Sequence, residues 1–226
     1  MARRSDASRF MAGVWVFPGG AVDDADETGD GAFNLSDGDR AWRAAALREL
    51  VEEMGIWVTT SGTLTQRVSG DVYAAAAERG LLLDGRALGY FANWITPAPL
   101  PIRFDTRFYA LVADVEPEVD GDELVDAVWI APGEALSRSE RTSWPVAFPT
   151  ARALAYLDSF ASASDVMADI AALDSVPPIQ PRLLLDDDGK LVVLLPGDPR
   201  FDEAAAGEAA LVGRLGELLD ESAARP

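Results

Sequence analysis

Apolar positions near the start of the chain predict one strand, a tight turn and a long helix. The run V-W-V-F at 14–17 is typical of a strand and enters the turn P-G-G at 18–20. The acidic, glycine-rich stretch 23–38 then predicts a loop. Residues 39–54 are dense in strong helix formers, begin with an aspartate that can cap a helix and stop before a glycine.

The middle of the chain alternates short helices with strands. A helix is expected over 71–79, and apolar or alternating runs predict strands over 89–95, 107–115 and 127–130. The segment P-G-E-A-L that follows suits the first turn of another helix, with proline near its start. This mixture predicts an α/β fold.

Beyond about residue 149 the pattern changes to helices and one hairpin. Segments 149–160 and 162–173 have helical periodicity, and a pair of prolines then breaks the chain. Two apolar runs around Asp-Gly predict a hairpin over 182–195. A last amphipathic helix is expected over 202–219. We find no repeat and no linker that divides the chain.

Three glutamates lie on one face of the long helix. At about 100° per residue, its apolar side chains gather on one side, and Glu49, Glu52 and Glu53 project from the other. An ordinary solvated surface has the same pattern. Glu49 and Glu53, however, are like charges four residues apart, which is destabilising unless a cation lies between them. Arg48, the only nearby base, can pair with one glutamate only. A solvated surface and a metal site both remain open.

The composition excludes several kinds of chemistry. The 226 residues include 38 acidic and 19 basic ones, and a net charge of −19 argues against binding nucleic acid or an anionic membrane. With no cysteine and no histidine, catalysis would use carboxylates, tyrosine, Lys190 and hard metal ions held by oxygen. The sequence shows neither a secretory signal nor a membrane-spanning run, so a cytoplasmic location is expected.

The stretch R-E-L-V-E-E-M-G-I, which begins at Arg48, resembles the second half of the Nudix box, R-E-U-x-E-E-x-G-U, in which U is a bulky aliphatic residue. The preceding F-P-G-G resembles the strand and turn that open the box. This resemblance implies that Glu49, Glu52 and Glu53 bind Mg²⁺ or Mn²⁺. It also implies that Arg48 orients them. Oxygen ligands for a hard ion agree with the absence of histidine and cysteine.

The spacing between the two halves departs from the family pattern. In the usual box the turn glycine lies fourteen residues before the arginine, and a glutamate follows that glycine after six residues. Here Gly20 and Arg48 are twenty-eight residues apart, so about fourteen extra residues lie in the loop.

The first glutamate of the box is therefore not located. Counting back from the arginine reaches Asn34 and Arg40, neither of which fits. Asp23 resembles an acid that many family members carry after the turn. Asp37 or Asp39 could replace the glutamate, or it could be dispensable.

The N-terminal segment narrows the resemblance. R-S-D-A-S-R-F-M-A-G-V-W-V-F-P-G-G fits the spacing R-[SA]-x3-R-x3-G-x3-F-P-G-G of coenzyme A pyrophosphatases in the Nudix family. The residues that this implies in substrate binding are Arg4, Arg9, Phe17, Gly19 and Gly20. Arg4 and Arg9 would pair with phosphates, which guanidinium groups bind well. The alternative is that both arginines only solvate the surface of an acidic protein. The insertion and segments 94–97 and 103–109 resemble the longer, peroxisomal-type coenzyme A members.

Two further acids could take part in catalysis. Glu123 lies six residues before Trp129, where many Nudix proteins carry a loop glutamate that binds metal or acts as a base. Plain loop surface is the alternative for this residue. Asp105 is expected to pair with Arg103 or Arg107 in preference to a catalytic role.

The N-terminus raises the question of a partner chain. Nudix domains usually have a further strand before the segment that begins here at Arg4, and only three residues precede it. The start could lie upstream, or the sheet edge could be open or covered by a second copy. A homodimer is therefore a hypothesis.

These observations predict an α/β/α Nudix sandwich with a mixed sheet, plus a C-terminal helical extension with a hairpin. Residues 1–148 would form the Nudix hydrolase domain, with the inserted loop 23–38. Residues 149–226 would form the extension, packed on the same domain.

The expected function is metal-dependent hydrolysis of a diphosphate linkage in coenzyme A or acyl-coenzyme A, giving 3',5'-ADP and phosphopantetheine. Glu53, Glu123 or Asp105 could accept the proton. Alternatives are hydrolysis of ADP-ribose, NADH or a nucleoside triphosphate, a non-catalytic nucleotide-binding module, and a structural protein with a vestigial box.

Overall fold

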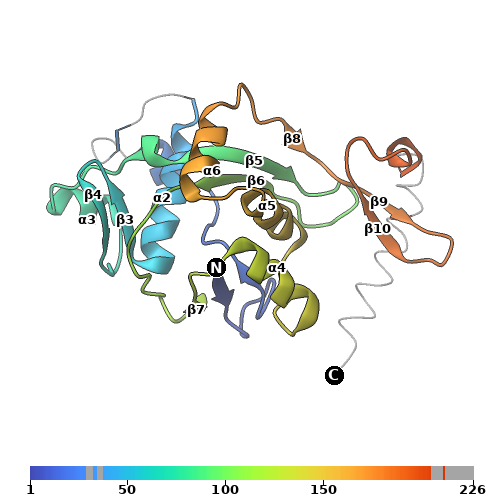
Figure 1. The fold of residues 1–226 in the computed structure, drawn as a ribbon. Coiled ribbons are helices and arrows are strands. Elements are labelled where there is room, and N and C mark those ends of the chain that lie inside the picture. The colour runs from blue at the N-terminus through green and yellow to red at the C-terminus, as the bar shows by residue number, and fades with distance from the viewer. Residues whose placement is uncertain (29–32, 35–37, 205–210, 212–226) are drawn as a thin grey trace. The chain divides into compact units, whose positions relative to one another are not determined.

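The computed structural model describes residues 1–28, 33–34, 38–204 and 211 and divides into two compact units (Figure 1). The first comprises Met1–Tyr90 and Tyr109–Leu173, and the second comprises Phe91–Phe108 and Asp174–Pro226. The boundary expected at residue 148 differs from this division, because the two helices that follow it belong to the first unit.

The first unit contains a three-stranded sheet, a separate two-stranded hairpin and most of the described helices. Its elements are β1 (Ala2–Arg4), β2 (Trp15–Val16), α1 (Asp24–Thr28), α2 (Arg40–Met54), β3 (Ile56–Thr59), β4 (Gly62–Thr65), α3 (Val72–Glu78), a 3₁₀ turn η1 (Gly85–Ala87), β7 (Leu124–Ala127), α4 (Pro132–Arg141), α5 (Phe148–Asp158) and α6 (Ala163–Ala171). The second unit contains β8 (Pro178–Ile179), β9 (Arg182–Leu185) and β10 (Leu191–Leu194). The unit boundary passes through β5 (Gly89–Ile95) and β6 (Asp105–Ala110).

The short strand β1 is paired on both sides. The order of its sheet is β2-β1-β7, all antiparallel, and Ala2 lies opposite Val16 on one side and Ala127 on the other. The open edge considered before Arg4 is therefore not found at β1, and a homodimer stays a prediction without this support. A second sheet has the order β6-β5-β8, in which β5 and β8 are parallel.

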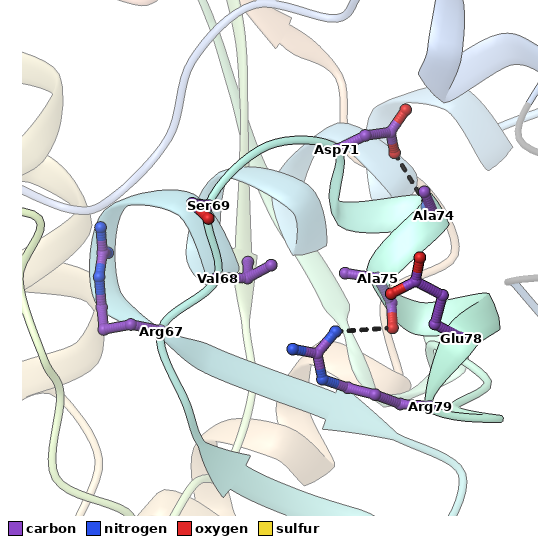
Figure 2. Close-up of a pocket in the computed structure, with 8 residues that line it drawn as sticks. All are labelled: Arg67, Val68, Ser69, Asp71, Ala74, Ala75, Glu78 and Arg79. Carbon is purple, nitrogen blue, oxygen red and sulfur yellow. Dashed lines mark hydrogen bonds between the residues drawn. The ribbon is translucent and has the colours of Figure 1, made fainter.

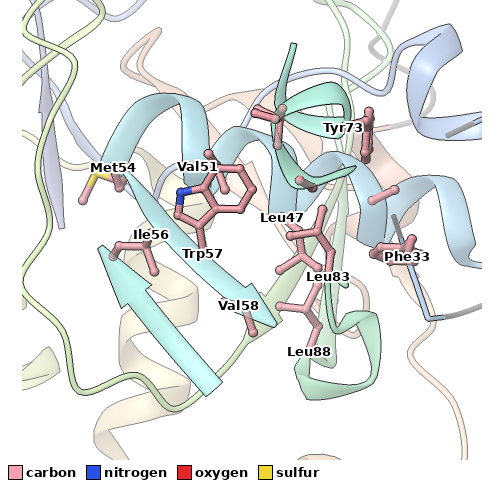
Figure 3. Close-up of a cluster of buried hydrophobic side chains, with 14 of the residues drawn as sticks. Phe33, Leu47, Val51, Met54, Ile56, Trp57, Val58, Tyr73, Leu83 and Leu88 are labelled. Carbon is pink, nitrogen blue, oxygen red and sulfur yellow. The ribbon is translucent and has the colours of Figure 1, made fainter. Parts of the chain in front are cut away.

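Helix α2 forms where the sequence predicts it. It ends at Gly55, whose φ of 65° is left-handed and favours glycine. Asp39 precedes the helix but makes no capping hydrogen bond with its side chain. The apolar face of α2 packs into the main core (Figure 3), where Leu47 and Val51 lie with the fully buried Trp57 of β3. This packing fixes which face of α2 is directed to the site.

Several predicted elements differ from the structure. The strands expected over 107–115 and 127–130 lie earlier, as β6 and β7, because pairing with neighbouring strands selects other residues than the apolar runs do. The loop expected over 23–38 contains α1, and the β3–β4 hairpin was not anticipated.

The C-terminal predictions are confirmed as far as the described residues extend. Helix α6 and the β9–β10 hairpin lie within the expected segments, and α5 begins one residue before its segment, at Phe148. Of the helix predicted over 202–219, only 202–204 and 211 are described, and these are helical. Within the described part of the chain, no helix combines the length and the apolar character that crossing a membrane requires.

Candidate active site

Arg48 lies at the centre of the candidate site and is only 7% exposed. Its Nε and Nη2 donate to the two carboxylate oxygens of Asp26, each at 3.0 Å. Nη2 also donates to the carbonyl oxygen of Ala21 at 2.8 Å. This two-point pairing fixes the plane of the guanidinium group.

The opposite side of the same guanidinium holds two glutamates. Nη1 donates to Glu49 Oε1 at 2.7 Å and to Glu52 Oε2 at 2.8 Å. The expectation that Arg48 pairs with only one glutamate is wrong, because the side chain of the adjacent Glu49 folds back onto it. Arg48 thus orients two of the predicted metal ligands.

Asp26 provides the acid that the sequence analysis did not locate. It lies six residues after Gly20, on the short helix α1, and its exposed fraction is 0%. Tyr73 Oη donates to its Oδ1 at 2.6 Å, and the Asp23 backbone N–H donates to its Oδ2 at 2.9 Å. Counting forward from the turn, and not back from Arg48, would have found this residue.

Of the two other candidates, the described one, Asp39, does not take that place. Asp39 accepts hydrogen bonds from Arg43 at 2.9 Å and from Tyr109 at 3.2 Å. Asp37 lies outside the described residues. The extra residues of the insertion therefore follow Asp26 and precede α2, so the acid keeps its place after the turn.

The glycine turn lies against Glu53 and Glu49. The backbone N–H of Gly19 donates to Glu53 Oε2 at 2.7 Å. A Cβ atom on Gly20 would overlap the carboxylate of Glu49, so Glu49 keeps this position only beside a glycine. Glu53 is 4% exposed. The interpretation of this helix face as an ordinary solvated surface is therefore wrong for Glu53.

Burial and like charges raise the pKa values of these carboxyl groups. Burial raises the pKa of Glu53 to about 8; the Gly19 N–H opposes this rise, and the charges of Glu49 and Glu123 add to it. Burial also raises the pKa of Glu49, although Arg48 lowers it. Such a site favours an added positive charge.

The loop that carries Glu123 is hydrogen-bonded to the end of α2, the helix of the three glutamates. The loop is held to the end of α2, because the N–H groups of Glu118 and Asp120 donate to Met54 O at 2.8 Å and to Glu53 O at 3.1 Å. The Asp120 carboxylate accepts hydrogen bonds from the N–H groups of residues 122–124, which shapes the loop. Glu123 Oε1 then pairs with Arg4 Nη2 at 3.0 Å.

Of the predicted substrate-binding residues, Arg4 and Phe17 lie at the ends of strands, and Arg9 lies in the loop between those strands. Arg4 ends β1 beside Glu123, and Phe17 is half-buried directly after β2. Arg9 is exposed in the loop between these strands and makes no hydrogen bond or ion pair with any described residue. Gly13 closes this loop with a φ of 69°, which gives the glycine of the N-terminal pattern a structural reason as well.

Asp105 does not form the ion pair that the sequence suggested. It is exposed at the start of β6, and among the described residues it pairs with neither Arg103 nor Arg107.

The donor set suits a hard divalent cation, although the described side chains are not assembled around one. In residues 1–28, 33–34, 38–204 and 211, no three acidic side chains converge closely enough to hold a metal ion. Glu53 is turned to Gly19, and Glu49 and Glu52 are turned to Arg48. The oxygen donors and the raised pKa values fit Mg²⁺ or Mn²⁺. The ligand set of Glu49, Glu52 and Glu53 stays a prediction.

A separate groove of about 310 Å³ lies beside α3 (Figure 2). Its lining is formed by Arg67, Val68, Ser69, Asp71, Ala74, Ala75, Glu78 and Arg79. None of the predicted site residues lines it. Both of its arginines donate to backbone carbonyls, Arg67 to Glu52 O and Arg79 to Ala75 O.

The turn, the α2 glutamates and the anchored arginine agree with a comparison of the whole sequence with known families. Residues 1–151 match the family described as "NUDIX domain", and the chain therefore belongs to the Nudix family.

Individual relatives agree with this assignment. The chain is 32% identical over 152 residues to "Putative nudix hydrolase 7" of Caenorhabditis elegans; the match covers 62% of this chain and 48% of that protein, about half its length. It is 26% identical to "Acyl-coenzyme A diphosphatase NUDT19" of Gallus gallus, over 89% of this chain and 72% of that protein. The crystal structure of a NUDIX hydrolase from Alicyclobacillus acidocaldarius matches with a TM-score of 0.63 at 28% identity, over 74% of this chain and 86% of that one. The predicted α/β Nudix fold is confirmed.

Proposed function

We propose that this chain is a metal-dependent hydrolase of diphosphate linkages. The observation that carries the proposal is the contact between the glycine turn at 18–20 and the glutamates of α2. Glu53 and Glu49 lie against Gly19 and Gly20, while Arg48, anchored on Asp26, holds Glu49 and Glu52. A group of hard oxygen donors beside an exposed glycine turn suits a diphosphate that carries a divalent cation.

The proposed substrate is coenzyme A or an acyl derivative, with 3',5'-ADP and phosphopantetheine as products. Arg4 supports this choice, because it belongs to the N-terminal pattern and lies next to Glu123. The similarity to a protein named as an acyl-coenzyme A diphosphatase also supports it. We include Arg9, Phe17 and the two turn glycines in the substrate-binding set from the sequence pattern.

Each residue would have a distinct part in the reaction. Glu49, Glu52 and Glu53 would hold Mg²⁺ or Mn²⁺, which when bound neutralises the diphosphate and activates water. Arg48 is buried and would orient two of these carboxylates, Glu49 and Glu52. Arg4 would exchange its pairing with Glu123 for a substrate phosphate.

Proton transfer would use the carboxylates of the site, because the chain has no histidine. Glu123 is held by its loop beside Arg4, and Glu53 is held by the Gly19 N–H. We assign the proton of the attacking water to one of these two carboxylates.

The test is product analysis of the purified chain. It would be incubated with Mg²⁺ and separately with coenzyme A, acyl-coenzyme A, ADP-ribose, NADH and a nucleoside triphosphate, and the products would be separated by chromatography. Reaction in ¹⁸O-labelled water identifies the phosphorus attacked, from the product that gains the label. Glu53→Gln controls for contaminating phosphatases, and Glu134→Gln, in an exposed ion pair on α4, is the matched control.

The outcomes separate the candidates. Release of 3',5'-ADP at equal rates by the wild type and by Glu134→Gln, and about 100-fold more slowly by Glu53→Gln, supports the proposal. Turnover of ADP-ribose alone contradicts the coenzyme A assignment. Thermal stabilisation by a nucleotide without turnover of any compound identifies a binding module instead.

A further inference from the structure

Tyr73 lies on α3, outside the turn and helix that carry the predicted metal ligands, but its hydroxyl reaches the centre of the site. Tyr73 is 9% exposed, and its Oη donates to Asp26 Oδ1 at 2.6 Å. Burial and the neighbouring Asp26 charge raise the pKa of Tyr73, so the hydroxyl keeps its proton and acts as a donor.

The buried carboxylate of Asp26 is fully occupied by four donors. Oδ1 accepts from Tyr73 Oη and Arg48 Nε, and Oδ2 accepts from Arg48 Nη2 and the Asp23 N–H. At 0% exposure, water cannot replace a lost donor without a change in packing. The position of the Tyr73 hydroxyl therefore helps to set the position of this carboxylate.

Arg48 links Asp26 to two of the glutamates by further hydrogen bonds. Asp26 binds the Nε and Nη2 side of Arg48, and Arg48 Nη1 binds Glu49 and Glu52. A rotation of the Asp26 carboxylate would tilt the guanidinium plane and move both glutamate oxygens with it.

We propose that Tyr73 is a positioning residue for the predicted metal ligands, acting through Asp26 and Arg48 on Glu49 and Glu52. This inference rests on the proposed function, since the ligands are those assigned to Mg²⁺ or Mn²⁺. Outer residues that orient metal ligands contribute about 10–100-fold to metal affinity or activity.

The test compares two tyrosine variants of the full chain. Tyr73→Phe removes only the hydroxyl, and Tyr109→Phe removes one that donates to Asp39 at 3.2 Å in the same unit. Mn²⁺ affinity would be measured without substrate, by the electron paramagnetic resonance signal of free Mn²⁺. We expect Tyr73→Phe to weaken Mn²⁺ binding about tenfold and to lower kcat without changing KM for coenzyme A. Tyr109→Phe should change none of these quantities.

The route through Asp26 is tested by a double-mutant cycle. If Tyr73 acts through this carboxylate, adding Tyr73→Phe to Asp26→Asn causes no further loss of Mn²⁺ affinity. Equal losses in both backgrounds contradict the route. Asp26→Asn also tests the inference if Tyr73→Phe does not fold, because unchanged Mn²⁺ affinity in Asp26→Asn contradicts it.

The remaining outcomes distinguish the inference from the proposed function. Equal Mn²⁺ affinity in Tyr73→Phe and the wild type overturns the inference, even if the variant unfolds at a lower temperature. A wild type that binds no Mn²⁺ overturns the proposed function and the inference together.

Discussion

Helices α2 and α4 contain the same pairing of charges in different surroundings. Each has a glutamate and an arginine four residues apart. In α4, Glu134 and Arg138 are paired at 2.5 Å with side chains 54% and 46% exposed. In α2, Arg48 and Glu52 are paired at 2.8 Å, but the arginine side chain is 9% exposed and also bound by the buried Asp26.

The comparison shows that charge spacing alone does not distinguish a surface from a site. An exposed pair contributes about 0.2–1 kcal/mol, whereas removing one partner of a buried pair costs about 3–5 kcal/mol. The difference comes from a residue twenty-two positions before Arg48, which no helical periodicity can reveal.

The largest expected effect is the difference in stability loss between Arg48→Ala and Arg138→Ala. Arg48→Ala leaves Asp26 buried without its ionic partner, so we expect a loss of about 3–5 kcal/mol in the free energy of unfolding. Arg138→Ala should cost less than about 1 kcal/mol. Urea unfolding of both variants measures the difference. Similar losses in the two would mean that the burial of Arg48 has no energetic consequence.

The next effect concerns catalysis. Glu53→Gln keeps an acceptor for the Gly19 N–H but cannot ionise to bind a cation. We expect kcat to fall about 100-fold, as for the loss of a positioned acid–base group. In metal-free buffer the free energy of unfolding should be unchanged or higher, because a buried charge is costly. Glu134→Gln should leave kcat unchanged; a wild-type rate in Glu53→Gln would exclude this glutamate from the reaction.

Two glycines extend the comparison, because each lies against a carboxylate. A Cβ atom on Gly20 would overlap Glu49, and one on Gly133 at the start of α4 would overlap Asp158. The flexible ends of these acids can move, so both alanine variants should fold. Gly20→Ala should lower kcat about tenfold by displacing a ligand, and Gly133→Ala should not. Steady-state kinetics of the pair give the answer, and equal rates would contradict a role for the position of Glu49.

Local signals in the sequence predicted the core of the site. The helix propensities of residues 39–54 and the glycine at 55 were sufficient to predict α2. The motif at 18–20 predicted the turn that contacts its glutamates. Helices and tight turns depend on residues only a few positions apart in the chain, so the sequence shows them directly.

The missing parts depend on contacts between distant segments. Asp26 and Tyr73 are forty-seven positions apart, and the sequence does not show on which side of Asp26 the insertion lies. Strand β7 was placed a few residues too late, because its register is set by pairing with β1 and not by its own apolar run.

The smallest effect should come from Arg4, at the edge of the site. Its side chain is 18% exposed and that of its partner Glu123 is 52% exposed, so solvent screens this ion pair. Arg4→Lys keeps the charge but loses the planar fork that suits phosphate. We expect KM for coenzyme A to rise about fivefold, the equivalent of about 1 kcal/mol, with kcat unchanged. Arg141→Lys, an exposed arginine at the end of α4, should change neither constant. If Arg4→Lys instead lowers kcat and leaves KM unchanged, Arg4 acts on Glu123 and not on the substrate, and the edge of the site belongs with the buried network around Arg48.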